Sequence, residues 1–514
     1  MKAGLPCRSV LLLLSATFAL AAMAAAPLKK EEDDPNAPVS YFKKIRPIFQ
    51  AQCQGCHQPA KAKGGYVMTD FAKLLAGGES AADGERAIIA KDPEHSLLIK
   101  QITPIKGEAE MPPKKPPLPE AQLQLIRRWI AEGAVDDTPA NARQRYDAAH
   151  PPVYQRPPVI TSIDFSPDGA LLAVAGFHEV LLWKGDGSEM IARLVGLSER
   201  IQTVRFSPDG KKLAACGGRP AQMGEVQIWD VEKRRLTLSA PIGFDTVYGV
   251  SWSPDGQAVS FGCSDNSIRA IDAGTGQQVL QQISHNDWVL DTVFTHKGDQ
   301  LVSVGRDMSA KLTEFATQRF IDNISSITPG ALRGGLQTVA RHPQRDEFLV
   351  GGADGVPQAY RIVRKVQRRI GDNALCIRKW PAMEGRIYGV DFAPDGLKFA
   401  AATSLDGKGA VNFYNYDFST EMPPDILAIE AKASRSDEEK KQVEAHYTSD
   451  TKLLVSVALD AGVFALRYRP DGSAVAIAGE DGKVRFLSPV DGKIVKEFSP
   501  APLAPAGTAA VEPK

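Results

Sequence analysis

Residues 163–169 read Ile-Asp-Phe-Ser-Pro-Asp-Gly, and close copies of this stretch return along the chain. In each copy, a short apolar run leads into Pro-Asp-Gly or a near relative. Proline sets φ at the first corner of a turn, aspartate bonds to the local backbone, and glycine takes the left-handed position. The stretch therefore predicts a tight turn between two antiparallel strands. The clearest further copies begin at Val204, Val250, Val390 and Leu466.

Weaker copies lie at residues 297–299 and 342–343, which gives about seven units, mostly about 40–50 residues apart. After the turn comes a small apolar strand, as at residues 171–176, and then a third strand that ends in an aromatic residue such as Trp183 or Trp229. The small residues would let neighbouring units approach closely. Such a sheet cannot bury both of its faces alone, so we expect the units to stack in a ring.

These units resemble the WD-repeat family over about 340 residues. Trp229-Asp230 reproduces the terminal Trp-Asp pair of that family, whereas its Gly-His dipeptide is absent from the sequence. We expect an all-β propeller of about seven blades over residues 160–500 and a flexible tail at 501–514. An insertion is expected at about 420–450, with a short polar helix from Ser436 to His446.

The N-terminus has the three-part pattern of a secretory signal. Lys2 and Arg8 form a short basic start, residues 10–22 are almost continuously apolar, and residues 22–24 read Ala-Met-Ala. We expect residues 1–24 to be a signal peptide and the protein to be exported, to the periplasm or the cell surface of a bacterium. An uncleaved N-terminal anchor is the alternative. No later segment is apolar for long enough to span a bilayer.

Composition excludes several classes of protein. The 514 residues contain 61 acidic and 61 basic side chains, so no excess of charge favours nucleic acid as a partner. Of six cysteines, Cys7 would leave with the signal, and Cys216, Cys263 and Cys376 are isolated. Three isolated cysteines cannot all pair within one chain, so we expect no disulfide framework.

The strongest chemical signal is Cys53-Gln54-Gly55-Cys56-His57. Two thiols three positions apart can form thioethers with the vinyl groups of one haem, and the adjacent imidazole can bind its iron. A zinc site would need further ligands at suitable spacing, and the sequence has no second cysteine pair. A thioredoxin-like site would need an α/β setting, which this region lacks. The motif therefore predicts one covalent haem c.

The iron also needs a sixth ligand. Met111, in a proline-flanked loop, is our first choice, because a thioether would raise the reduction potential. His95 is the alternative ligand, although a polar residue at the start of a helix also explains it. Trp129 is expected to pack in the core of the same domain.

Residues 40–137 are expected to form a small all-α domain. Tyr41, Ile45 and Ile48 share a helical face, and Pro47 should begin a new helix or kink this one. A second helix should follow Pro119 and end near Gly133. Charged residues 25–39 and the proline-rich stretch 138–159 read as linkers.

This domain resembles the planctomycete-type cytochrome c family. The motifs that carry the resemblance are Pro47-Ile48-Phe49, residues 53–57, 63–65, 77–80 and 92–99, Met111-Pro112-Pro113, and residues 128–134. The resemblance implies that Cys53 and Cys56 attach the haem and that His57 and Met111 are the axial ligands. Members are often fused to propellers or other exported domains.

The sequence thus favours an exported c-type cytochrome that transfers electrons, with the propeller as a docking platform for a redox partner or another protein. One alternative is a WD-repeat interaction scaffold with a structural or sensory haem. Another is a haem-dependent oxidoreductase that binds its substrate in the propeller. No convergent catalytic set is evident, which favours an electron carrier and binding protein over an enzyme.

Overall fold

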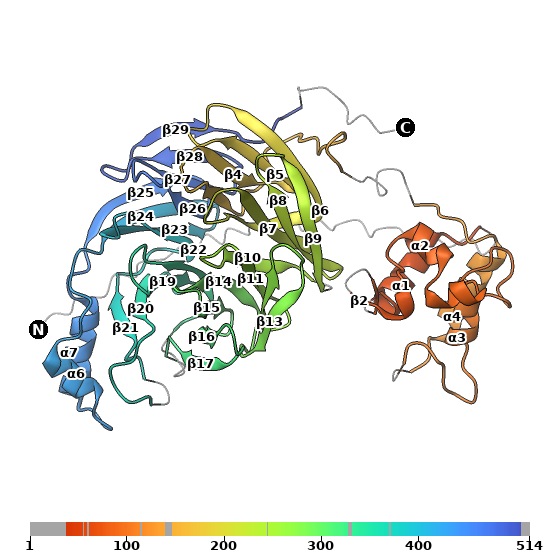
Figure 1. Cartoon of the computed structure of the whole chain (residues 1–514), viewed down its shortest axis with the longest axis horizontal. Coiled ribbons are helices and arrows are strands. Elements are labelled where there is room, and N and C mark those ends of the chain that lie inside the picture. The colour runs from red at the N-terminus through yellow and green to blue at the C-terminus, as the bar shows by residue number, and fades with distance from the viewer. Residues whose placement is uncertain are drawn as a thin grey trace, which may run out of the picture.

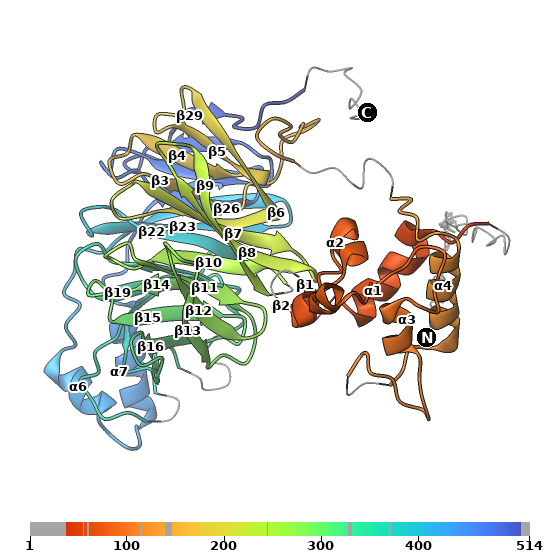
Figure 2. The ribbon, with the colours of Figure 1, turned by 45° about the vertical axis from the view of Figure 1, so that its right-hand side comes forward.

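The structure, a computed structural model, describes residues 37–54, 56–58, 61–113, 116–138, 146–243, 245–326, 332–369 and 372–504. The expected signal peptide, residues 25–36 of the first linker, residues 139–145 of the second and residues 505–514 of the tail lie outside these ranges. Figures 1 and 2 show a small helical unit and a separate, larger ring of sheets.

The helical unit begins with a π-helix, η1, that runs directly into α1, with Pro47 in the first turn of α1 as expected. Ser40 caps η1 by accepting a 2.9 Å hydrogen bond from the backbone N–H of Lys43. The elements are η1 (Tyr41–Ile45), α1 (Arg46–Gln52), β1 (His57–Gln58), β2 (Lys61–Ala62), η2 (Lys63–Gly65), α2 (Phe71–Ala76), η3 (Glu79–Asp83), α3 (Leu97–Ile102) and α4 (Glu120–Ala131).

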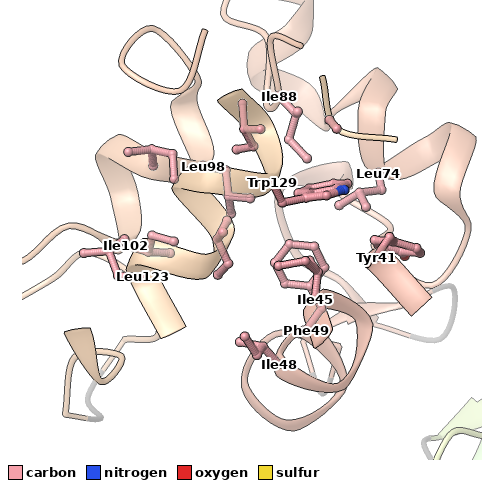
Figure 3. Packing of buried hydrophobic residues seen from close by; sticks show 14 of the residues in the cluster. Tyr41, Ile45, Ile48, Phe49, Leu74, Ile88, Leu98, Ile102, Leu123 and Trp129 are labelled. Carbon is pink, nitrogen blue, oxygen red and sulfur yellow. The ribbon is translucent and has the colours of Figure 1, made fainter. Parts of the chain in front are cut away.

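The core of this unit lies between α1, α3 and α4 (Figure 3). Leu123, Ile126 and Ile130 of α4 are buried at helical spacing, so one face of the helix turns inward. Trp129 is also buried, where it stacks on Tyr41 with ring centroids 5.4 Å apart. Burial of each such side chain contributes roughly 1.5–3 kcal/mol.

The ring consists of antiparallel sheets in which consecutive strands are neighbours. One sheet has seven strands: β3 (Ile163–Phe165), β4 (Leu171–Ala175), β5 (Phe177–Lys184), β6 (Met190–Phe206), β7 (Lys212–Arg219), β8 (Met223–Asp230) and β9 (Arg235–Gly243). The next two are β10 (Val247–Trp252), β11 (Ala258–Cys263), β12 (Ser267–Asp272) and β13 (Gln278–Ile283), then β14 (Val289–Phe294), β15 (Gln300–Gly305), β16 (Ala310–Glu314) and β17 (Phe320–Asn323).

Three more four-stranded sheets complete the ring. They are β18 (Leu336–Arg341), β19 (Glu347–Gly352), β20 (Gln358–Arg361) and β21 (Cys376–Lys379); β22 (Arg386–Phe392), β23 (Lys398–Leu405), β24 (Lys408–Asn415) and β25 (Leu453–Leu459); and β26 (Val463–Tyr468), β27 (Val475–Gly479), β28 (Val484–Leu487) and β29 (Ile494–Phe498).

The expected propeller is present, but its blade count differs in one detail. The described ring has six separate sheets, because the 17-residue β6 pairs with β5 through its first half and with β7 through its second. The seven-stranded sheet thus joins two blade units, β3 to β6 and β6 to β9, in one hydrogen-bonded surface (Figure 1). If β6 is counted twice, the ring has seven four-stranded blade units.

The repeated Pro-Asp-Gly turns form as the sequence predicts. Asp168 Oδ1 accepts hydrogen bonds from Ser166 Oγ at 2.6 Å and from the backbone N–H of Ala170 at 3.0 Å. Gly169 has a φ of 70°, which favours glycine. Asp209 and Asp255 accept the same two bonds in their own turns. The prediction that these aspartates are turn residues is confirmed.

Small residues bring neighbouring blade units together. A Cβ at Gly262 of β11 would collide with the main-chain oxygen of Val289 in β14, and one at Gly351 of β19 would collide with the side chain of Ile387 in β22. The second strand of each unit is almost wholly buried. Its small residues are therefore needed for the ring to close.

The ring closes without exchange of strands, because the last sheet has all four of its own strands and the first begins with β3. The segment that precedes β3 instead covers the junction between the first and the last sheet. Tyr154 forms a parallel bridge with Leu503. Its hydroxyl also donates a 2.7 Å hydrogen bond to Glu179, whose side chain is fully buried and paired with Arg193.

The segment between β24 and β25 forms two helices, α6 (Pro424–Glu430) and α7 (Asp437–Thr448), beside β21 (Figure 1). Ser436 and Glu439 form a capping box at the start of α7. Tyr447 anchors the pair, since its hydroxyl donates a 2.9 Å hydrogen bond to the buried Glu430.

Candidate haem site

The two cysteines and the histidine of the motif lie in one tight turn at the end of α1. The backbone N–H of Cys53 continues the helix by bonding to the carbonyl of Phe49 at 2.9 Å. The backbone N–H groups of Cys56 and His57 both bond to the carbonyl of Cys53, at 3.0 and 3.1 Å. The turn therefore brings both thiols and the imidazole onto one short segment.

Both thiols are free, and Cys53 packs against the hydrophobic core of the helical unit. Burial raises the pKa of Cys53 to about 12, with a smaller contribution from Cys56. Cysteines of redox-active Cys-x-x-Cys pairs have a lowered pKa instead, because the thiolate is the nucleophile. The environment of Cys53 thus argues against a thioredoxin-like activity.

His57 is held by the chain that follows it. Its main-chain oxygen accepts a 2.8 Å hydrogen bond from Met68, and its ring meets the ring of Tyr66 edge-on at 5.5 Å. Burial lowers the pKa of His57, and the main-chain carbonyls of Tyr66 and Lys63 only partly oppose this shift. The imidazole is therefore neutral at pH 7, which is the form that binds iron.

The Nδ1 atom of His57 is buried and has no hydrogen-bond partner among the described residues. A buried polar atom without a protein partner is a group that a bound ligand or ion can satisfy. Two free thiols three positions apart, beside a neutral imidazole, are the donor set that a c-type haem requires. The residues present therefore fit covalent haem attachment.

The loop after α2, which contains Gly78, packs against the residues that follow His57. Tyr66 fixes it by donating a 2.9 Å hydrogen bond from its hydroxyl to the carbonyl of Leu74, at the end of α2. Gly78 allows the close approach, because a Cβ there would collide with the main-chain oxygen of Gly64 and with Tyr66. The sequence shows the pair Gly77-Gly78, but the need for glycine at position 78 comes from a tertiary contact that the sequence does not show.

Met111 and Cys53 pack against the same hydrophobic core. Met111 is half-buried, and its backbone N–H bonds to the carbonyl of Gln101 in α3 at 2.9 Å. The structure thus places the first-choice sixth ligand on the core that also supports the cysteine turn. Its assignment to the iron is part of the proposal below.

His95 lies apart from this group. Its side chain is 75% exposed, and its Nδ1 is 2.8 Å from the carboxylate of Asp92. The hydrogen bond from His95 is the main cause that lowers the pKa of Asp92. A surface histidine paired with its own loop explains this residue without a metal.

Trp129 occupies the core, as expected. Its Nε1–H donates a 3.0 Å hydrogen bond to the carbonyl of Val135, and Phe49 and Phe71 meet its ring edge-on at 6.2 Å each. The side chain is therefore fixed on several sides (Figure 3).

The propeller contains a Ser-His-Asp cluster that the sequence did not reveal. His285 Nε2 is 2.8 Å from Ser303 Oγ, and its Nδ1 is 2.9 Å from Asp307. The order resembles that of a hydrolase triad, but both His285 and Ser303 are buried, so no substrate can reach the serine. Hydrogen bonds from His285 hold the pKa of Asp307 well below its usual range against the effect of burial. The cluster ties the loop between β13 and β14 to β15 and to the turn that follows β15.

Known sequence families match both parts of the chain. A family described as Planctomycete cytochrome C matches residues 53–115, beginning at Cys53. WD domain, G-beta repeat matches residues 233–272, and Anaphase-promoting complex subunit 4 WD40 domain matches residues 436–505. The chain is a cytochrome c-like domain fused to a WD-repeat region. The first match is to a family of cytochromes c, and haem binding by this chain is part of the proposal below.

Proteins similar to this chain are WD-repeat proteins. Eukaryotic translation initiation factor 3 subunit I of Coccidioides immitis (strain RS) is 26% identical over 210 residues, which cover 37% of this chain and 59% of that protein. Cilia- and flagella-associated protein 52 of Chlamydomonas reinhardtii is 22% identical over 335 residues, which cover 62% of this chain and 51% of that protein. The chain thus spans little more than half the length of these relatives.

A solved structure shares the fold of the WD-repeat region. A chain of the "Crystal Structure of Mitotic Checkpoint Complex" aligns with a TM-score of 0.50 and 17% identity, over 68% of this chain and 99% of that one. At this identity the likeness concerns the fold alone. Within the ranges that the structure describes, no helix is both long enough and apolar enough to cross a membrane.

Proposed function

We propose that this protein is an exported bacterial c-type cytochrome with one covalent haem that transfers electrons, and that its propeller docks a redox partner or another protein. Cys53 and Cys56 would hold the haem, and His57 and Met111 would bind its iron. The observation that carries the proposal is the turn at residues 53–57, where two free thiols lie beside a neutral histidine at the start of the cytochrome match.

The haem would supply one-electron redox chemistry. The helical unit supplies a rigid support, because Cys53 and Met111 both pack against a core fixed by Trp129. Electron transfer benefits from such rigidity, since the ligands need not rearrange between oxidation states. Export, to the periplasm or the cell surface, rests on the pattern of residues 1–24.

An interaction scaffold with a structural or sensory haem is the second candidate. It is supported by the relatives, which are named as subunits or associated proteins of larger assemblies. An iron with a stable methionine ligand and reversible reduction would favour electron transfer. An iron that binds carbon monoxide readily in its reduced state would favour sensing.

The first experiment is extraction of haem from the exported protein, produced in a host that matures c-type cytochromes. After denaturation and acid–acetone treatment, we expect the reduced-haem absorption spectrum to remain with the wild-type polypeptide. It should be lost from the Cys53→Ala, Cys56→Ala variant and retained by Cys216→Ala, a buried propeller thiol. Haem that extracts from the wild type would overturn the proposal.

A further inference from the structure

A cavity of about 300 Å³ lies on the axis of the propeller, where the innermost strands of the blade units begin. Residues from β3, β6, β10, β14, β18, β22 and β26 line it, so every blade unit contributes. Its size is at the lower end of the range for small-molecule sites in proteins.

Several half-buried side chains of the lining are uncharged, and some of them are aromatic; we call this part of the lining the mouth. They are those of Gln202, Tyr248, Gln337, Tyr388 and Phe464. The rings of Tyr388 and Phe464 meet edge-on at 5.0 Å, so they form one aromatic wall. Opposing amide groups and aromatic faces suit a molecule that has both hydroxyl groups and apolar ring faces.

The carboxylates around the axis are committed to the protein itself. Each accepts a hydrogen bond from the main chain of the next blade unit, and so ties two inner strands together. The pairs are Asp164 with the N–H of Phe206 at 2.8 Å, Asp291 with that of Val339 at 3.0 Å, and Asp391 with that of Tyr468 at 2.8 Å. These acids are therefore structural parts of the ring.

Arg205 is the group that the protein leaves incompletely bonded. Its guanidinium donates only from Nη1, to Val204 O at 2.7 Å and to Ser162 Oγ at 3.3 Å. Its Nε and Nη2 have no hydrogen-bond partner among the described residues, although Arg205 lines the cavity. By contrast, Arg467 lies 3.3 Å from Asp164. A bound oxygen atom would complete the hydrogen bonding of Arg205.

The charges around Arg205 indicate whether this oxygen atom belongs to an anionic or an uncharged ligand. Three carboxylates, those of Asp164, Asp291 and Asp391, interact electrostatically with Arg205. Burial raises the pKa of all three, to about 7 for Asp391, so their charge roughly offsets that of the two arginines of the channel. An anion would gain no net attraction from such a balanced site, whereas an uncharged hydroxyl or carbonyl can accept from the guanidinium without disturbing the balance.

We infer that the propeller channel binds a small, uncharged, polyhydroxylated molecule of monosaccharide size. Its hydroxyl oxygens accept from Arg205, its other hydroxyls bond to Gln202 and Gln337, and its ring lies against Tyr388 and Phe464. This site consists only of propeller residues, so the inference stands or falls independently of the haem.

Saturation-transfer difference NMR on the full-length protein tests the inference, with glucose and N-acetylglucosamine as neutral probes and glucuronate as the charged comparison. We expect transfer to at least one neutral sugar and at least tenfold weaker binding to Arg205→Met. Gln337→Ala, at the mouth, is the second variant and should weaken binding if Arg205→Met fails to fold. Gln281→Ala, the same substitution at an exposed position on β13, should bind as the wild type does.

The inference is overturned if neither neutral sugar shows transfer, or if glucuronate alone does. It is also overturned if Gln337→Ala binds as tightly as Gln281→Ala, because the sugar would then bind elsewhere.

Discussion

Replacement of Arg193 by methionine is expected to lower the free energy of unfolding of the propeller by about 3–5 kcal/mol. Glu179 is fully buried, and the Nε and Nη2 atoms of Arg193 each donate a 2.7 Å hydrogen bond to its carboxylate. Arg193 also donates to the carbonyl of Pro152, in the segment that covers the ring junction, at 2.5 Å. Loss of the guanidinium leaves a buried carboxylate whose charge is unpaired.

Urea unfolding of the purified protein, followed by circular dichroism, measures this effect. Lys184→Met is the matched control, because Lys184 and Glu189 form a 2.6 Å ion pair in the same blade unit with side chains 50% and 61% exposed. Water screens such a pair, so its loss should change stability by less than about 1 kcal/mol.

A second substitution tests the cause. Glu179→Gln in the Arg193→Met background removes the buried charge, while the amide oxygen can still accept from Tyr154. The double variant should therefore be more stable than Arg193→Met alone. The reasoning is refuted if Arg193→Met unfolds within about 1 kcal/mol of the wild type, or if the double variant recovers nothing.

Three further predictions concern the haem site and the channel. Met111→Ala is expected to shift the absorption bands that report the axial ligands, whereas His95→Ala, at an exposed side chain, should leave them unchanged; a wild-type spectrum for Met111→Ala would remove it from the ligand set. Gly78→Ala should lower the yield of covalent haem and the melting temperature of the helical unit, because its Cβ would collide with main-chain atoms. Gly84→Ala is the control: its Cβ meets no atom within 4 Å, so it should lower the free energy of unfolding by only about 1–2 kcal/mol, because of its left-handed backbone. Equal melting temperatures of Gly78→Ala and Gly84→Ala would contradict the role of Gly78. Burial raises the pKa of Asp391 to about 7, so the folded protein keeps a proton that the unfolded chain releases from about pH 4 upward. Stability should then fall as pH rises from about 4 to 7, by up to about 1.4 kcal/mol per pH unit, and Asp391→Asn should flatten this slope in chemical denaturation; an unchanged slope would show that other groups cause it.

The propeller could be predicted because each of its turns is encoded locally. Ser166, Asp168 and Gly169 make all the contacts of their turn within five residues, so the sequence pattern contains the whole interaction. The fusion of two blade units through β6 has a local signal too. Residues 190–206 contain no proline and no Pro-Asp-Gly turn, so nothing stops the strand.

The haem motif could be predicted for the same reason, since Cys53, Cys56 and His57 are contiguous. The rest of the site depends on contacts between distant segments. The packing of Met111 and Cys53 against one core, and the need for glycine at position 78, arise only when loops far apart in sequence meet.

The Ser-His-Asp cluster shows the same limit. Its histidine and aspartate are 22 positions apart, and the strands β14 and β15 lie between them in the sequence. Ser303 is 18 positions from His285, so no contiguous motif marks the cluster in the sequence.

The continuous strand β6 also has a mechanical consequence. The helical unit is joined to the propeller through the segment that includes Tyr154, which is anchored on the first blade unit. A force on the helical unit, such as a docked partner would exert, therefore acts first on that blade unit. Because β6 belongs to the second unit as well, the load passes along one covalent backbone and two sets of cross-strand hydrogen bonds. The linking segment is thus anchored on a continuous sheet of two blade units. Such a sheet should resist shear better than a single blade unit that is joined to the next one only by a loop.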